Sequence, residues 1–310
     1  MRIVRSLDRA RGSVRAPVVT IGNFDGVHHG HQVILRQLIR DARARHAPAV
    51  VLTFDPHPVA VVRPQAAPRL LMTLGDRLAT LARHGVDVTV VQRFSRDFAA
   101  IEADDFIRRF LVEILDAQKI LVGHDLNFGR GRSGNVDTLI AAGARHGFAV
   151  EVIGPVEVDG VPVHSSRIRE LVAAGDVASA HRLLGRPHRV RGRVRHGAGR
   201  GKGLGFATAN VRPRTPLPPG DGVYVTVVHL DGQELDSVTS IGSTPTFGGG
   251  ESVIEAHIFA DVGDIYGRPI ALDFLARLRD QQRFESPTAL VAQIEKDVAE
   301  AKAVLAARRG

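Results

Sequence analysis

The chain of 310 residues is 44% hydrophobic and 24% charged, a globular composition that is long enough for two domains, each with its own core. It has no cysteine for a disulfide, a thiolate metal site or a nucleophile, no apolar run that could span a membrane and no apolar secretory signal, so we expect a cytoplasmic protein. The formal charge of +8 favours anionic partners, and phosphorylated small molecules fit better than single-stranded nucleic acid because aromatic residues are only 5% of the chain.

Short apolar runs alternate with helical patterns through the first half of the chain. The helical segments carry apolar residues at three- and four-residue spacing, as Phe106, Phe110 and Ile114 illustrate. The expected strands are 18–21, 49–54, 87–91, 119–123 and 149–153, and the expected helices lie near 30–45, 75–84, 102–116 and 134–146. The alternation predicts an α/β domain, a Rossmann-like doubly wound parallel sheet that binds ligands at the carboxyl ends of its strands.

Residues 22–31, Gly-Asn-Phe-Asp-Gly-Val-His-His-Gly-His, follow the first of these strands. A glycine-bearing turn that opens a helix directs backbone N–H groups and the positive end of the helix dipole at one point. His28 and His31 lie about one turn apart and can reach the same phosphate, which Gly30 lets the backbone approach. A zinc site is the alternative, but no third ligand is spaced as in helical zinc motifs. The segment predicts a triphosphate site.

Two loops after later strands are further candidates. Residues 53–58, Thr-Phe-Asp-Pro-His-Pro, form a proline-fixed loop that is either the wall of a substrate pocket or a plain turn. Residues 123–134 contain a formal Gly-X-Gly-X-X-Gly, but it does not follow its strand directly, and Glu151 falls inside the next strand. We therefore expect contact with a phosphorylated substrate there, and no dinucleotide fingerprint.

Ser165-Ser166-Arg167-Ile168-Arg169 opens a helix that is expected to run toward Ala180. Hydroxyl groups and a guanidinium at a helix N-terminus can form an anion site, and a capped surface helix is the plainer alternative.

The pattern changes near Gly185-Arg186-Pro187, where we place a boundary between domains 1–186 and 187–310. The later runs are short, rich in β-forming residues and separated by turn signals, which predicts an all-β antiparallel barrel or sandwich. These runs are 189–195, 222–229, 236–242, 252–260 and 268–276. Ser286-Pro287 then opens a terminal helix. Its apolar stripe, expected to pack in the core, is Leu290, Ile294, Val298 and Leu305.

Two features of this second half could carry chemistry. Residues 186–202 hold seven Lys or Arg and no acidic residue, and a glycine-rich loop then leads to Thr208 and Asn210. The loop could form an anion nest with oxygen ligands for magnesium, or it could be a generic basic patch. In 252–259, strand alternation puts Glu255 and His257 on one face, where the carboxylate could be a general base or part of a salt bridge.

Together, these segments resemble the bacterial bifunctional riboflavin kinase/FAD synthetase family over essentially the whole chain. The first module is similar in residues 22–31, 53–58, 123–134 and 165–169, the signature of a nucleotidylyltransferase that adenylates FMN. The second module is similar in residues 206–210, 241–247, Glu255 and 278–279, which resemble the flavokinase barrel. The resemblance implies a transferase that phosphorylates riboflavin to FMN and adenylates FMN to FAD, with release of pyrophosphate.

For the first module, the resemblance implies that His28 and His31 stabilise charge on the ATP phosphates. The other implied ATP contacts are Gly22, Asn23, Phe24, Asp25, Gly30, Ser165, Ser166 and Arg167, and the implied FMN contacts are Pro56, His57, Asp125, Asn127 and Arg132.

For the second module, the resemblance implies that Glu255 is the general base and that Thr208 and Asn210 hold Mg²⁺ and phosphate. Gly197, Lys202 and Tyr266 match further ATP contacts, and Arg279 and Phe284 match the flavin side. The sequence departs from the family pattern at Ala207, His164 and Gln282. The expected partners are ATP, riboflavin and FMN, with neither nucleic acid nor membrane.

Two alternatives to this function stay open at this point. The first module could adenylate another phosphorylated metabolite, with the barrel as a binding module, or residues 186–202 could contact nucleic acid.

Overall fold

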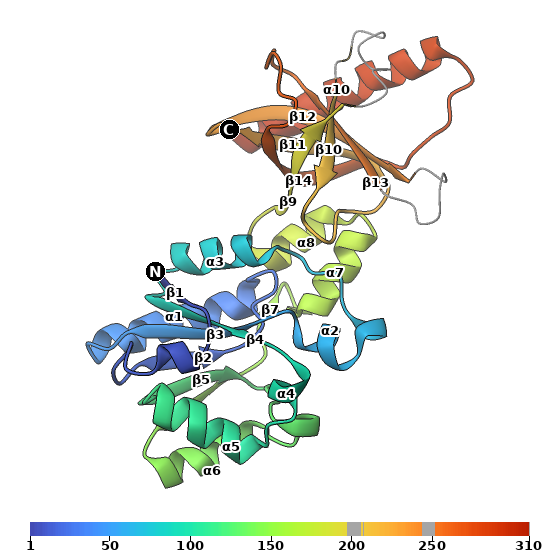
Figure 1. The fold of residues 1–310 in the computed structure, drawn as a ribbon. Coiled ribbons are helices and arrows are strands. Elements are labelled where there is room, and N and C mark those ends of the chain that lie inside the picture. The colour runs from blue at the N-terminus through green and yellow to red at the C-terminus, as the bar shows by residue number, and fades with distance from the viewer. Residues whose placement is uncertain (197–205, 207, 244–251, 310) are drawn as a thin grey trace. The chain divides into compact units, whose positions relative to one another are not determined.

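The computed structural model describes residues 1–196, 206, 208–243 and 252–309, which are drawn as coloured ribbon in Figure 1. The chain forms two compact units, one of residues 1–68 and 74–164, the other of residues 69–73 and 165–310. The sequence suggested a different boundary, near residue 186, between two functional domains. That boundary remains a prediction.

The first unit is built on a six-stranded sheet in which every neighbouring pair of strands is parallel, in the order β1-β4-β3-β2-β5-β6. The strands are β1 (Arg2–Val4), β2 (Val18–Ile21), β3 (Ala49–Asp55), β4 (Val88–Arg93), β5 (Lys119–Gly123) and β6 (Ala149–Ile153). The five expected strands are confirmed, and β1 was missed because three residues are too short for a periodic pattern. The predicted α/β doubly wound sheet is therefore correct.

Helices cover both faces of this sheet (Figure 1). Alternate strand residues such as Val19 and Ile21 pack against Phe106, Phe110 and the other apolar residues of one helical layer, while α1 packs on β2, β3 and β5. The helices are α1 (His29–Ala44), α2 (Pro58–Val62), α3 (Leu74–Arg83), α4 (Arg96–Ala99), α5 (Ala103–Phe106), the π-helical η3 (Ile107–Ile114) and α6 (Val136–His146), with short 3₁₀ turns η1 (Asp8–Ala10), η2 (Pro64–Ala66) and η4 (Arg130–Arg132). A small hairpin of β7 (Glu157–Val158) and β8 (Val161–Pro162) ends the unit.

The second unit contains a closed antiparallel barrel with strand order β10-β13-β12-β11-β14-β9, so the barrel alternative is correct and the sandwich is not. The strands are β9 (His188–Arg195), β10 (Ala209–Pro213), β11 (Gly222–Leu230), β12 (Gln233–Ser243), β13 (Ser252–Ile258) and β14 (Pro269–Arg279). The sequence missed β10, whose five residues include an asparagine and a proline that are poor strand formers.

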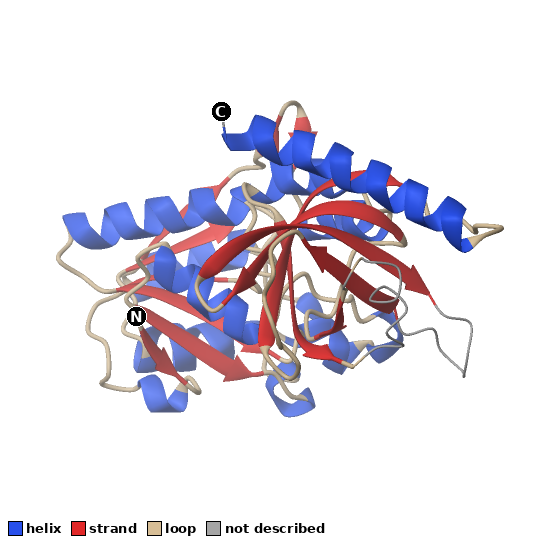
Figure 2. Cartoon of the chain, turned by 90° about the horizontal axis from the view of Figure 1, so that it is seen from above, coloured by secondary structure: helices blue, strands red, loops and turns tan. Residues whose placement is uncertain are grey.

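The long terminal helix α10 (Pro287–Arg309) lies along the outside of the barrel (Figure 2). Leu305 and Val298 of the predicted apolar stripe pack, together with Ala301, on Val223, Val225 and other residues of β11 and β12. Leu290 and Ile294, the other two residues of the stripe, are half-buried and do not belong to this cluster.

The predicted single helix from Ser165 to Ala180 is wrong. The structure has two helices, α7 (Ser165–Ala173) and α8 (Val177–Leu184). Gly175 between them has a φ of +80°, and a Cβ at this position would lie 2.5 Å from the hydroxyl of Tyr224. Asp176 then caps α8 by accepting a hydrogen bond from the N–H of Ser179 at 2.9 Å.

Candidate active sites

The loop between β2 and α1 has an unusual backbone. Phe24 and Val27 have φ values of +51° and +42°, a region that costs a non-glycine residue on the order of 1–3 kcal/mol. Gly26 between them, at +84°, adopts the same region without that cost. Phe24 and Asp25 are buried, and the side-chain amide of Gln32 donates to the carbonyl of Val27 at 2.9 Å. The loop is therefore held in a strained conformation by its surroundings.

The structure brings the two predicted histidines together at the start of α1. The imidazole rings of His28 and His31 stack with centroids 3.7 Å apart. His28 caps the helix, since its Nδ1 accepts from the N–H of His31 at 3.4 Å, and this leaves the ring proton on Nε2. A Cβ at Gly30 would lie 3.3 Å from the His28 ring, so a larger residue there would crowd the pair. An Nε2–H donor thus stands at the positive end of a 16-residue helix, an arrangement suited to phosphate oxygens.

Sequence analysis missed Arg77 in α3, which is only 4% exposed. Its Nη1 donates to the carbonyl of Asn23 at 2.6 Å and to the hydroxyl of Thr53 at 3.2 Å, and its Nη2 lies 3.9 Å from Asp55 Oδ1. Burial lowers the pKa of Arg77, while the carboxylates of Asp25 and Asp55 act in the opposite direction. The available signal was a charged residue on the apolar face of an amphipathic helix.

The predicted FMN contacts lie at the ends of β3 and β5. Pro56 and His57 follow β3, and the His57 ring caps α2. Asp125, Asn127 and Arg132 are exposed on the loop that follows β5, where the side-chain amide of Asn127 donates to the carbonyl of Asp125 at 2.8 Å. Both groups are therefore at the carboxyl edge of the sheet, where doubly wound folds bind ligands.

Two of the three glycines in residues 129–134 have a packing explanation, while a Cβ at the third, Gly131, would meet nothing within 4 Å. Phe128 and Gly134 pair as an isolated β-bridge, and a Cβ at Gly134 would come within 2.6 Å of the Phe128 ring. A Cβ at Gly129 would lie 2.8 Å from the backbone of Ala103. This loop closes on itself and does not pass directly from a strand into a helix, as a dinucleotide-binding turn does.

Ser165, Ser166 and Arg167 are the first three residues of α7, in the second unit. Ser166 and Arg167 are exposed, and Arg167 Nη1 lies 3.2 Å from Glu170 Oε2. An exposed pair of this kind holds the guanidinium weakly, so it leaves Arg167 free to turn toward an anion.

Strand register in the barrel aligns the predicted kinase residues. Asn210 of β10 lies opposite Glu255 of β13, and Glu255 lies opposite Ser240 of β12. Residues that lie directly opposite each other on paired strands point to the same face of the sheet. Ile254 and Ala256, the neighbours of Glu255 in β13, are buried in the barrel core, so Glu255 and Asn210 face away from that core. Thr208 precedes Asn210 by two residues, and Gly197 and Lys202 lie outside the described residues. Glu255 and Asn210 are thus neighbours.

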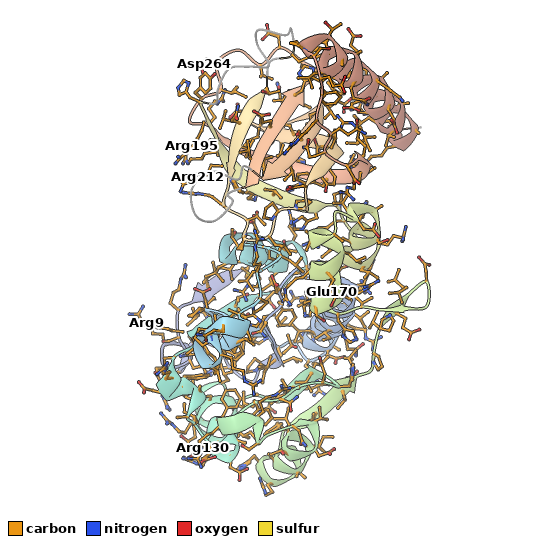
Figure 3. All side chains as sticks on the ribbon, turned by 90° about the vertical axis from the view of Figure 1, so that its right-hand side faces the viewer. Arg9, Arg130, Glu170, Arg195, Arg212 and Asp264 are labelled. Carbon is orange, nitrogen blue, oxygen red and sulfur yellow. The ribbon has the colours of Figure 1, made fainter. Side chains whose placement is uncertain are left out.

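Positive charge flanks this group on the other side. Arg195 of β9 lies opposite Asn210, and Arg212 lies opposite Arg193. Figure 3 shows the side chains of Arg195 and Arg212 extending outward from the barrel wall, and both residues are exposed. Tyr266, predicted to contact nucleotide, is 51% exposed and stacks on His196 with centroids 3.7 Å apart.

The predicted flavin contacts lie near each other where β14 meets α10. The Arg279 guanidinium is 5.8 Å from the centre of the Phe284 ring, and its Nη2 lies 2.7 Å from the buried Asp297 of α10. Arg279 therefore has a structural partner as well as its predicted role. Gln282 and His164 are exposed, and Ala207 lies outside the described residues.

Comparison with known proteins gives one consistent result. The family model for FAD synthetase matches residues 11–167, and the model for riboflavin kinase matches residues 184–305. A bifunctional riboflavin kinase/FMN adenylyltransferase of Pseudomonas fluorescens is 41% identical over 99% of this chain and 98% of its own length. The chain belongs to the bifunctional riboflavin kinase/FMN adenylyltransferase family. The member from Escherichia coli K12 is 38% identical, with 96% of each chain covered.

A solved structure has the same fold over nearly the full length of this family member. The protein, described as a macrolide-efflux protein from Streptococcus pneumoniae, is 31% identical with a TM-score of 0.87, and 97% of this chain and 98% of that chain are covered. That description belongs to the pneumococcal protein. In the part of our chain that the structure describes, no helix is both long enough and apolar enough to cross a membrane.

Proposed function

We propose that the chain makes FAD from riboflavin in two ATP-dependent steps, carried out by two separate sets of residues. The observation that carries this proposal is the pairing of two family regions with two polar clusters, the histidine pair in residues 11–167 and the Asn210–Glu255 pair in residues 184–305. Membership in the family makes the chain a transferase with both activities. Adenylation of another metabolite, with the barrel as a mere binding module, is not favoured because the second region matches a riboflavin kinase.

In the kinase step, the riboflavin 5′-hydroxyl attacks the γ-phosphorus of ATP. A new O–P bond forms, the bond from the γ-phosphorus to the bridging oxygen breaks, and ADP leaves. Glu255 accepts the proton of the hydroxyl, and its place beside Asn210 supports this role. Lys202, Gly197 and Tyr266 complete the proposed ATP contacts, and Arg279 with Phe284 holds the flavin.

Magnesium fits the donor set on this face of the barrel. The Thr208 hydroxyl and the Asn210 side-chain amide supply oxygen, which Mg²⁺ prefers, and a carboxylate lies directly opposite Asn210. Mg²⁺ held there together with ATP would neutralise phosphate charge.

In the adenylylation step, a phosphate oxygen of FMN attacks the α-phosphorus of a second ATP, and pyrophosphate leaves. His28 and His31 donate hydrogen bonds to the ATP phosphate oxygens as negative charge develops on these oxygens. Positioning of the reactants and this electrostatic stabilisation account for catalysis of the step. Residues 22–25, Gly30 and residues 165–167 are the proposed ATP contacts. The proposed FMN contacts are Pro56, His57, Asp125, Asn127 and Arg132.

The proposal assigns adenylylation to residues 1–186 and phosphorylation to residues 187–310. It also places the protein in the cytoplasm, because ATP, the substrate of both steps, is a cytoplasmic metabolite.

The test is incubation of the purified protein with riboflavin, ATP and Mg²⁺, followed by chromatographic separation of the flavins. We expect FMN to appear first and FAD to follow, and a reaction started from FMN to give FAD and pyrophosphate. The absence of both FMN and FAD would contradict the proposal, and FAD from FMN without FMN from riboflavin would remove the kinase half.

A further inference from the structure

Arg77 stands apart from every motif in the chain, yet it is among the most buried charged residues that the structure describes. It sits on the inner side of α3 beside the buried Leu78 and Leu81. Removing a guanidinium from water is costly, and an apolar side chain of similar length would pack this helix without that cost. Stability alone therefore gives no reason for an arginine here.

The contacts of Arg77 link two strand ends. The carbonyl of Asn23, just after β2, accepts from Arg77 Nη1 at 2.6 Å and from the Thr53 hydroxyl at 3.2 Å. Arg77 also donates to that hydroxyl, and its Nη2 lies 3.9 Å from Asp55 at the end of β3. The guanidinium is planar and holds its donors in a fixed geometry. From its place on α3 it thus joins the end of β2 to the end of β3.

What Arg77 holds is the start of the strained loop. Phe24 comes directly after Asn23, Val27 comes directly before His28, and both have a positive φ. Such conformations persist only where neighbouring contacts fix them. If the Asn23 carbonyl were released, the loop could relax to ordinary backbone angles and change the direction in which α1 begins.

We propose that Arg77 is a positioning residue for adenylyl transfer, acting through the Asn23 carbonyl to fix the loop that orients His28 and His31. This inference rests on the proposed function of the histidine pair. Arg77 acts here through protein groups, since its Nη1 donates to the Asn23 carbonyl and to the Thr53 hydroxyl. Its effect is on geometry, so it should change the rate of the bound complex more than the affinity for ATP.

The kinetic test compares Arg77→Met, Arg77→Lys and the matched control Arg83→Met, which removes an exposed arginine of the same helix that bonds only locally to Thr80. We expect Arg77→Met to lower kcat for FAD formation from FMN by roughly 10- to 100-fold, with KM for ATP changed by less than about threefold. Arg77→Lys should recover part of the rate, and Arg83→Met should match the wild type. Riboflavin kinase activity of the same samples should stay constant.

A second measurement does not depend on activity. Amide hydrogen exchange of the segment 22–31 should be about tenfold or more faster in Arg77→Met than in the wild type, with exchange in the barrel strands unchanged. If the wild type makes no FAD, the proposed function fails, but the exchange experiment still tests Arg77.

Three results would overturn the inference. They are a kcat for Arg77→Met within about twofold of the wild type, unchanged exchange in segment 22–31, or an equal loss of kinase activity in a variant that still folds. If Arg77→Met does not fold, Arg77→Lys decides: because lysine lacks the guanidinium geometry, an unchanged kcat for that variant overturns the inference.

Discussion

His28, which caps α1, and His31 lie beside His29, the first residue of this helix, and the three histidines offer a comparison at one place in the chain. Only His28 and His31 stack on each other, and His28 also caps the helix. Replacing both with alanine should lower FAD formation from FMN by roughly 10²–10⁴-fold, because donors placed for developing phosphate charge are lost. His29→Ala should keep most of the activity. Separate assays of FMN formation and FAD formation check this, and equal loss in the His29 control would argue against a special role for the pair.

The role of Glu255 can be tested by a substitution that keeps the size and shape of its side chain. Glu255→Gln keeps the size of the side chain beside Asn210 but cannot take a proton, so FMN formation should fall by about 10²–10⁴-fold while FAD formation from FMN continues. Glu234→Gln, on an exposed position of β12, is the matched control. An unchanged kinase rate in Glu255→Gln would mean that the carboxylate only forms structural contacts.

Some functional residues could be predicted from the sequence and others could not. The histidine pair could be predicted because both members lie in one short segment behind a recognisable strand. Arg77 lies 54 residues from the Asn23 carbonyl that it contacts. No local pattern contains such a contact, since it depends on how α3 packs against the end of β2 in the folded chain. The alignment of Asn210 with Glu255 was hidden for the same reason.

At the scale of elements, an ionic cluster joins three barrel strands. Asp273 of β14 is buried and accepts two hydrogen bonds from Arg189 of β9 at 2.6 Å, and His229 Nε2 of β11 lies 2.9 Å from its Oδ2. Burial alone would raise the pKa of Asp273, but the bonds from Arg189 and His229 outweigh burial and lower the pKa below the usual 3.8.

Because the folded-state pKa of Asp273 lies below the unfolded one, its stabilisation is present above about pH 4 and is lost as the pH falls through the folded value. Asp273→Asn should therefore reduce the barrel's free energy of unfolding at pH 7 by about 1–3 kcal/mol, less than for a fully buried pair because Arg189 is partly exposed. Tyrosine fluorescence in urea can follow the barrel alone, since the chain has no tryptophan and its two tyrosines, Tyr224 and Tyr266, belong to the second unit. A gap between variant and wild type that did not shrink below pH 4 would contradict this assignment.

The elements themselves were predictable to the extent that their patterns were local. Helices such as α5 with η3 bury one regular set of residues, which periodicity found, whereas strands such as β3, with five consecutive buried residues, were found as short apolar runs. The break between α7 and α8 was missed although Gly175, at a φ of +80°, and the cap residue Asp176 are local signals for it. What the local sequence does not reveal is the close approach of Tyr224, a barrel residue 49 positions after Gly175. The five-residue β10 is defined by its pairing with β9 and β13, which its composition does not reveal.

At the scale of the whole molecule, the sheet unit and the barrel unit each have an apolar core of their own among the described residues. One lies in the sheet unit around Val50, Leu52 and Phe110, and the other fills the barrel around Tyr224, Val228 and Phe274. Each proposed reaction has its own chemical groups, and FMN, the product of one and the substrate of the other, is a stable molecule that can be released between the two. A single chain therefore need not perform both steps on the same flavin.

This separation predicts complementation between full-length variants. Glu255→Gln should make little FMN, and His28→Ala/His31→Ala should stop at FMN, so neither alone should convert riboflavin to FAD. An equimolar mixture should form FAD, because FMN released by the histidine variant reaches the intact adenylyltransferase of the other chain. The time course should show FMN accumulating before FAD, and the rate of FAD formation should rise with the concentration of the Glu255 variant. If the mixture made FMN but no FAD while the Glu255 variant still adenylated added FMN, the released-intermediate scheme would be wrong and transfer of FMN would have to occur within one chain.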